Sequence, residues 1–209
     1  MITPFQRSVA AMFFSLDESA GFAVAGGAAL IARALVDRST RDVDLFTTAP
    51  PAVPIPDVVS AFTRAAVTQG WLVRQLRLSD TFARLAVEGE GDVTVVDLGL
   101  DSPPDEPPSI TELGPTLAAR DLAARKVLAL FGRAEARDFA DVRDLADVYP
   151  KDELLLLARA QDGGFDLGVF ADMIGTATRY SDDELSLSTH DAAQLRRFFR
   201  DWREELQND

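Results

Sequence analysis

Along the first 70 positions, apolar residues follow a helical spacing in some segments and form short strand-like runs in others. Apolar residues three and four positions apart predict an amphipathic helix, and short runs rich in Val, Ala and Phe predict buried strands. In chain order, the pattern predicts a helix at 3–16, a strand at 22–25, a helix at 28–35 and a strand at 42–47. Asp57 is expected to cap the next helix and Gly70 to end it.

The second part of the pattern divides into strands and then helices. Strands are expected at 71–78, 81–88 and 93–98, followed by a proline-rich break at 102–109. Helices are expected beyond the break at 115–130, 138–148, 151–160, 166–176 and 191–206. The chain is therefore expected to be α+β, with a small mixed sheet and flanking helices in residues 1–108 and a helical domain in residues 109–209.

Composition removes several classes of function. With 47% hydrophobic residues, the chain of 209 residues can bury a core and is not expected to be disordered. It has no cysteine and one histidine, His190, which excludes disulfides, thiolate zinc sites, a cysteine nucleophile and a histidine-rich metal site. The chain shows no targeting segment and no apolar run of membrane-spanning length. We therefore expect a soluble cytoplasmic protein with no membrane partner.

Charge is distributed unevenly along the chain. The net charge of −13 argues against a cationic coat for nucleic acid over the whole surface. Residues 120–143, however, contain six of the cationic side chains, namely Arg120, Arg125, Lys126, Arg133, Arg137 and Arg143. A local groove for an anionic ligand stays open, whereas the acidic C-terminal third is better explained as a solvated face.

Two short motifs indicate nucleotide and metal chemistry. Gly26 and Gly27 end an apolar run before a helix, and glycine-turn amides at such a position suit phosphate oxygens. Asp42 and Asp44 alternate on an expected strand, so both carboxylates point to one face. Carboxylates select hard divalent ions such as Mg²⁺, which also bind substrate phosphates. Together the motifs predict a site for a nucleotide and a metal ion.

Asp97 is a third candidate for this site. It shares a strand face with Val93 and Val95, and a carboxylate buried there without a partner would be costly. A metal ligand and an exposed aspartate at the strand end are the two interpretations, and both stay open.

Lys126 is one of only two lysines in the chain, against nineteen arginines, and lies in the middle of an expected helix. A lysine ammonium suits a nucleotide phosphate, although a solvated helical lysine is the simpler explanation. Arg137, Asp138 and Asp141 follow at the start of the next helix. These acids either cap that helix and pair within it, or orient Lys126 on a triphosphate; the spacing leaves both open.

With these motifs, the chain resembles the AbiEii/MenT family of nucleotidyltransferase toxins, in the polymerase-β-like nucleotidyltransferase superfamily. The matching segments are 24–30, 38–46, 95–98 and 126–141, so that the likeness covers about residues 20–145. Gly27 departs from the superfamily pattern, in which many members have serine. Phosphate contacts would then fall to backbone amides or to Ser39 and Thr40.

The resemblance implies a role for each motif. Asp42, Asp44 and Asp97 would hold Mg²⁺ or Mn²⁺, or Asp97 would accept the proton of the attacking hydroxyl. The triphosphate would be bound by Gly26, Gly27, Arg38, Ser39 and Thr40, with Arg41 near phosphate or acceptor RNA. Lys126 would hold the β- and γ-phosphates, with Asp141 and Asp138 orienting it or touching the nucleotide, so that the helical domain contributes Lys126 and Asp141 to the cleft.

The resemblance also implies a substrate and partners. NMP would be transferred from an NTP to the 3′ acceptor end of tRNA, a tRNA modification that blocks translation, and a cognate antitoxin would be the protein partner. Some relatives are silenced by phosphorylation near this aspartate, so Thr40, or else Ser39, is a candidate phosphorylation site. Two alternatives stay open: nucleotidylation of a small antibiotic-type molecule, which the negative net charge favours, and an inert binding module that keeps the fold.

Overall fold

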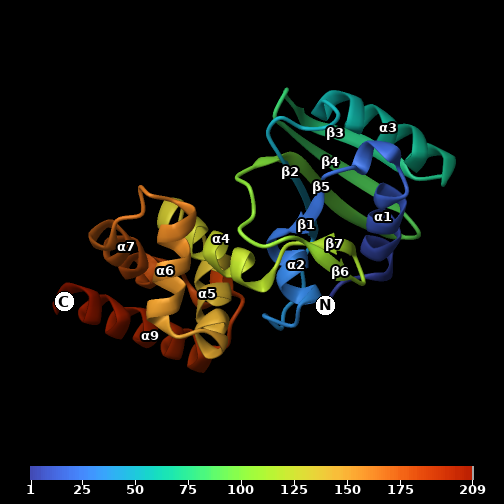
Figure 1. Cartoon of the computed structure of the whole chain (residues 1–209). Helices are drawn as coiled ribbons and strands as arrows, with labels where there is room; N and C mark the ends of the chain where they lie inside the picture. The colour runs from blue at the N-terminus through green and yellow to red at the C-terminus, as the bar shows by residue number, and fades with distance from the viewer. Residues whose placement is uncertain (209) are drawn as a thin grey trace. The chain divides into compact units, whose positions relative to one another are not determined.

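The computed structural model describes residues 1–208, which form two compact units, residues 1–122 and the remainder from residue 123. The first unit combines helices with a sheet, and the second is helical (Figure 1). The expected α+β class, with a small mixed sheet followed by helices, is confirmed. None of the described helices is long and apolar enough to cross a lipid bilayer.

The first unit is built on a seven-stranded mixed sheet with the order β3-β4-β5-β2-β1-β7-β6. At its centre β2 runs parallel to β5 and antiparallel to β1. The three strands β3, β4 and β5 form the expected antiparallel meander. The bounds are β1 (Ala23–Ala25), β2 (Asp42–Thr48), β3 (Leu72–Leu78), β4 (Phe82–Gly89), β5 (Asp92–Asp101), β6 (Ser109–Thr111) and β7 (Gly114–Thr116).

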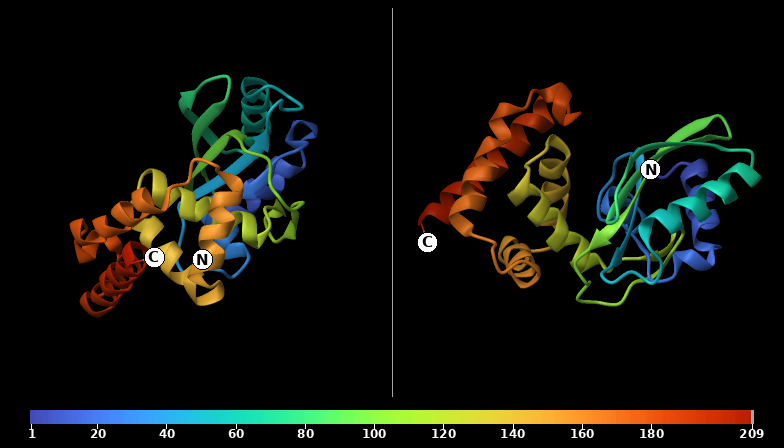
Figure 2. Two further views of the ribbon diagram at one scale, coloured as in Figure 1. Left: turned by 60° about the vertical axis from the view of Figure 1, so that its left-hand side comes forward. Right: turned by 90° about the horizontal axis from the view of Figure 1, so that it is seen from above.

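Two helices, α1 (Pro4–Phe14) and α3 (Ile55–Thr68), pack against each other and against the sheet (Figures 1 and 2). Phe13 and Phe62 meet between them, with ring centroids 6.3 Å apart. Alternate strand residues such as Leu45 and Leu85 are buried beneath these helices. The other face of the sheet carries the side chains in between, and the short helix α2 (Gly26–Ala32) follows β1 directly.

Two expectations about element boundaries are wrong. Asp57 does not cap α3; the helix begins at Ile55 after Pro54, and Asp57 lies in its first turn. The helix expected from residue 115 begins only at Ala119, because residues 114–116 form the strand β7 instead. β7 and its antiparallel partner β6 are each only three residues long. β7 also pairs with β1, which lies far away along the chain. The domain boundary expected after residue 108 therefore precedes β6 and β7, which belong to the sheet of the first unit.

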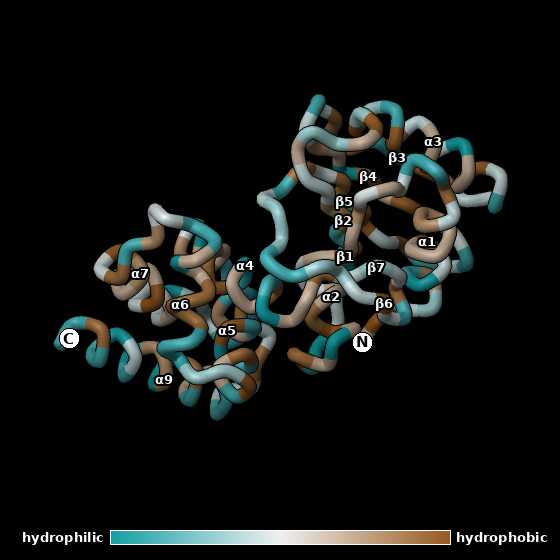
Figure 3. Tube along the Cα trace, viewed as in Figure 1, coloured by the Kyte–Doolittle hydropathy of each residue, from teal (hydrophilic) through white to brown (hydrophobic). Residues whose placement is uncertain are grey.

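The second unit consists of helices around an aromatic core. Its elements are α4 (Ala119–Gly132, which enters it from the first unit), α5 (Ala136–Val148), α6 (Lys151–Gln161), α7 (Leu167–Ile174), α8 (Asp182–Leu185) and α9 (Thr189–Asn208). The short helix α8 was not predicted. Apolar and polar residues alternate at helical spacing along α9 (Figure 3). Its Phe199 and Trp202 are buried with Phe139 and Phe170.

Candidate active site

Asp42 and Asp44 lie on one face of β2, as predicted from their spacing. Both side chains are half-buried, whereas Val43 and Leu45 between and beyond them are buried on the other face. Asp44 is aligned with Asp97 on β5, which runs parallel to β2. In-register residues of neighbouring strands share a face, so the sheet brings these three carboxylates to adjacent positions.

The glycine turn fits directly against Asp44. Gly26 has a φ of +59°, and a Cβ atom added to it would lie 1.8 Å from Oδ2 of Asp44. The carboxylate therefore occupies the space that any other side chain would need. A Cβ atom on Gly27 would lie 2.8 Å from Nη2 of Arg38 and 3.4 Å from Oγ1 of Thr40. The turn, Arg38 and Thr40 thus gather at the start of α2.

The two hydroxyl groups of this segment differ in access. Thr40 is buried, its carbonyl accepts a hydrogen bond from Nε2 of Gln6 at 3.0 Å, and its hydroxyl oxygen lies 3.4 Å from the amide nitrogen of Asp42. Ser39 is exposed, and its carbonyl accepts a hydrogen bond from Nη1 of Arg38 at 2.9 Å. Thr40 therefore supports the start of β2 at Asp42, whereas Ser39 faces solvent.

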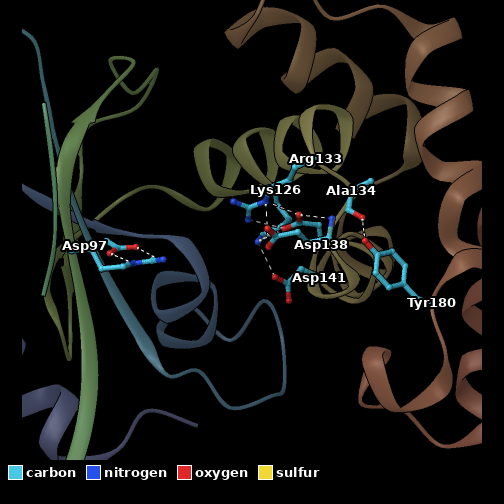
Figure 4. Close-up of polar contacts among 9 residues, drawn as sticks. Asp97, Lys126, Arg133, Ala134, Asp138, Asp141 and Tyr180 are labelled. Atoms are coloured by element: carbon cyan, nitrogen blue, oxygen red, sulfur yellow. Dashed lines mark hydrogen bonds and ion pairs between the residues drawn. The ribbon is translucent and has the colours of Figure 1, made fainter. Parts of the chain in front are cut away.

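Asp97 is held by Arg84, a residue that was not among the predicted site residues. Nε and Nη2 of Arg84, on β4, donate hydrogen bonds of 2.8 and 2.7 Å to the two carboxylate oxygens (Figure 4). The alternative of an exposed aspartate at a strand end is wrong, since Asp97 is only 5% exposed and lies within β5. Hydrogen bonding to Asp97 raises the pKa of Arg84 against the opposing effect of burial, and the charges of Asp97, Asp42 and Asp44 raise it further.

Arg84 could have been found from the hairpin register. The turn between β4 and β5 pairs Gly89 with Asp92, and counting outward from that pair places Arg84 opposite Asp97.

The donor set of β2 fits a divalent metal ion. Asp42 and Asp44 supply hard carboxylate oxygens from one face, beside a turn that leaves room for the Asp44 carboxylate. Both oxygens of Asp97 instead accept hydrogen bonds from Arg84. Within residues 1–208, no three His, Cys, Asp or Glu side chains are arranged to share one ion.

A second charged cluster lies in the helical unit, between α4 and α5. Nζ of Lys126 lies 3.2 Å from Oδ1 of Asp138 and 3.0 Å from Oδ2 of Asp141 (Figure 4). Both aspartates are buried, and Lys126 is only 9% exposed, so the alternative of a solvated lysine is wrong. Nε of Arg133 approaches Oδ2 of Asp138 to 2.9 Å.

Asp138 both caps α5 and pairs with Lys126 of α4. Its Oδ2 accepts a hydrogen bond of 3.2 Å from the backbone amide of Glu135 in a capping box, and its Oδ1 pairs with Lys126. Burial raises the pKa of Asp138, but the hydrogen bond from Arg133 and the charges of Lys126 and Arg133 outweigh burial and hold the pKa below its ordinary value. The carboxylate is therefore ionised at neutral pH.

Comparison with solved structures places the fold. JHP933 from Helicobacter pylori superposes with a TM-score of 0.59 at 14% identity, over 100% of this chain and 96% of that one. MenT4, a nucleotidyltransferase toxin from Mycobacterium tuberculosis, gives a TM-score of 0.56 at 16% identity, over 97% and 92% of the two chains. The antibiotic-resistance factor ANT(2'')-Ia gives 0.51 at 14% identity, over 77% and 92%. At such identities these likenesses concern the fold alone.

The sequence itself assigns the family. No curated protein matches the chain. The profile of the nucleotidyl transferase AbiEii toxin family, described as a type IV toxin–antitoxin system, matches residues 11–209. This match covers both units and includes the glycine turn, the paired aspartates and the Lys126 cluster. The chain therefore belongs to the AbiEii toxin family and is a nucleotidyltransferase.

Proposed function

We propose that this enzyme is a metal-dependent toxin that transfers NMP from an NTP to the 3′ end of tRNA and so blocks translation. Family membership already implies an NTP substrate and an antitoxin partner. The observation that most supports the chemistry is the pair Asp42 and Asp44, on one face of β2, with the Asp44 carboxylate seated on the backbone of Gly26.

In this proposal Asp42 and Asp44 hold Mg²⁺ or Mn²⁺. A bound divalent ion would supply charge neutralisation for the phosphate oxygens. Gly26 and Gly27 keep side chains away from the place where phosphates must approach the turn. Arg38, with Ser39 and Thr40 beside it, provides the cation and hydroxyl groups at the start of α2.

Lys126 holds the β- and γ-phosphates. Its ammonium has three N–H donors, and the contacts to Asp138 and Asp141 account for two of them. The two buried carboxylates fix the position of Nζ, which reduces the entropy that the lysine loses when it binds phosphate. Asp138 and Asp141 thus act by orienting Lys126.

The test is transfer from each of the four labelled NTPs to a pool of tRNA. We expect one nucleotide to be added at the 3′ end. Asp42→Asn should lower the rate on the order of 100-fold or more, because removal of a metal ligand forfeits several kcal/mol of charge stabilisation. The matched control is Asp57→Asn, an exposed residue of α3, which should transfer at the normal rate. Equal rates for the two variants would contradict the proposed role of Asp42.

Nucleotidylation of a small cationic molecule is the second candidate. The net charge of −13 supports it, because such a surface attracts cations and repels RNA. Replacing tRNA by aminoglycosides in the same assay separates the two acceptors. Label on the small molecule, with none on tRNA, would favour this candidate.

We also propose Thr40, or else Ser39, as a site at which phosphorylation silences the enzyme. A phosphate on either residue would add a charge of about −1.5 to −2 beside Asp42. Ser39 is exposed, whereas the buried Thr40 would require residues 37–41 to move. Mass spectrometry after co-expression with the antitoxin tests this. Enzyme that is inactive but unmodified at both residues would refute it.

A further inference from the structure

The sheet face that carries Asp44 also carries a row of charged side chains across four strands. In the strand register, Arg77 on β3 lies opposite Arg84 on β4, Arg84 lies opposite Asp97 on β5, and Asp97 lies beside Asp44 on β2. Neighbouring strands lie about 4.8 Å apart, so three strand spacings separate Asp44 from Arg77, about 14 Å. The row therefore leads from the candidate metal ligands to the edge of the sheet, entirely within the first unit.

Aromatic rings lie beside this row on the same face. Phe82 and Phe46 are aligned with Gly99 from either side, and a Cβ atom on Gly99 would lie 3.0 Å from Phe46 and 3.1 Å from Phe82. The guanidinium of Arg77 lies 5.5 Å from the centroid of the Phe82 ring. Both rings are half-buried, which leaves part of each accessible.

The arginines of the row retain donors for a ligand. Arg84 directs two of its five N–H groups to Asp97, and its side chain is 48% exposed. Arg77, and Arg74 on the same face of β3, are exposed and form no ion pair with any residue of the described part of the chain. An edge strand with exposed, unpaired arginines is a cationic surface on a chain that is otherwise strongly acidic.

We propose that Arg77, Phe82 and Arg84 bind the single-stranded 3′ end of the acceptor RNA and lead its terminal hydroxyl toward Asp42 and Asp44. The arginines contact phosphates, and a base stacks on Phe82. Asp97 is a positioning residue that holds the guanidinium of Arg84. This inference rests on the proposed function, because it concerns the acceptor of the same reaction.

Two observations favour an RNA strand over the NTP at this surface. A single strand in helical form carries one phosphate for about every 3.4 Å along its axis, and Arg84 and Arg77 lie on neighbouring strands about 4.8 Å apart, so the two guanidinium groups match successive phosphates. Arginine beside an accessible aromatic ring is the combination by which proteins bind unpaired nucleotides without reading their sequence. The NTP, by contrast, has its proposed cations at Arg38 and Lys126.

The experiment measures binding of a labelled RNA hairpin with an unpaired 3′ end by fluorescence anisotropy, without NTP. Arg77→Gln should reduce the slope of log K against log salt by about 0.7, the value for one phosphate contact on a single strand. Phe82→Leu should weaken binding about tenfold and leave that slope unchanged. The matched control for Arg77→Gln is Arg64→Gln on α3, which covers the other face of the sheet and should bind as the unchanged protein does.

The positioning role of Asp97 is tested by combining its substitution with that of Arg84. Asp97→Asn and Arg84→Gln should each weaken RNA binding, and the double variant should bind no more weakly than Arg84→Gln alone, because both changes remove the same positioned guanidinium. Additive losses would show that Asp97 acts on its own and would contradict its assignment as a positioning residue. Thermal unfolding, followed by the fluorescence of Trp71 in a Trp202→Phe background, verifies that the sheet unit of each variant is folded.

Three results would overturn the proposal: no binding of RNA by the unchanged protein, binding by Arg77→Gln and Phe82→Leu that equals the control, or an equal loss of affinity for RNA and for NTP. Failure of the proposed function gives a different pattern. Protein that binds RNA through this face but transfers no nucleotide would contradict the proposed reaction alone. Transfer to tRNA with unchanged binding by the variants would contradict this proposal alone.

Discussion

Gly26 shows how one backbone position supports the candidate site. Its φ of +59° lies in the left-handed region that other residues enter only with strain, and its missing side chain leaves the space that the Asp44 carboxylate fills. Two requirements therefore meet at one residue: the turn needs this backbone conformation, and the carboxylate needs the room. The glycine is thus coupled to the position of the proposed metal ligand.

Gly26→Ala should therefore impair transfer more than folding. The new methyl group would displace the Asp44 carboxylate by more than 1 Å, and a displacement of that size can cost on the order of 100-fold in rate. Gly91→Ala is the matched control, because Gly91 also has a positive φ, +78°, but has open space where the methyl group would lie. Steady-state transfer to tRNA and thermal melts are measured for both. Equal transfer rates for the two variants would show that the space beside Asp44 does not matter.

Between helices α4 and α5, one side chain makes both a helix-capping contact and a contact with the proposed phosphate-binding lysine. Asp138 closes the first turn of α5 through the amide of Glu135 and at the same time pairs with Lys126 of α4 and with Arg133. The start of α5 cannot shift without moving the carboxylate that holds the lysine. The position of Nζ of Lys126 therefore depends on how these two helices pack.

Asp138 predicts a loss of stability in acid. Its pKa is lowered in the folded protein, below the ordinary value of 3.8. The stabilisation is therefore complete above the pKa of the unfolded chain and is lost as the pH falls through the lower folded pKa. The free energy of unfolding of the helical unit should fall as the pH drops below about 4. Urea unfolding between pH 7 and pH 2 measures this dependence.

Asp138→Asn should remove this contribution to the pH dependence and cost about 3 kcal/mol at pH 7, because it leaves buried Lys126 with one carboxylate fewer. Asp147→Asn on the same helix is the control; its ion pair with Arg143 is exposed, so stability should change little. The assignment fails if Asp138→Asn retains the full acid dependence of the unchanged protein.

The molecule as a whole has one tryptophan in each compact unit. Trp71 is buried in the sheet unit against Phe5, and Trp202 is buried in the helical unit among Phe170, Phe198 and Phe199. The two signals can therefore report unfolding of the units separately.

Asp138→Asn should shift only the unfolding transition that Trp202 reports. In a Trp71→Phe background, the urea midpoint of the Trp202 signal should fall; in a Trp202→Phe background, the midpoint of the Trp71 signal should stay where it is. The physical reason is that all partners of Asp138 lie in the helical unit. Equal shifts of both midpoints would mean that the chain unfolds as one cooperative unit.

Much of the fold and part of the candidate site follow from local patterns. The period of two along 42–47 placed Asp42 and Asp44 on one face, and helical periodicity located most helices to within a few residues. β6 and β7 escaped prediction, because three-residue strands carry almost no periodic signal and are stabilised by partners such as Val24, far away along the chain. Asp57 was misassigned as a cap because Pro54 and Ile55 also fit a helix start.

The amino-acid order is sufficient to state which chemical groups are present and which face of a strand or helix they share, since both depend on spacing along the backbone. It is also sufficient to exclude thiol and histidine-rich chemistry, because the side chains are missing. Which charges meet depends instead on long-range packing: strand register joined Arg84 to Asp97, and the approach of α5 to α4 buried Lys126 between two aspartates. An ion pair forms where the folded chain brings its partners together, and spacing along the sequence does not contain that information.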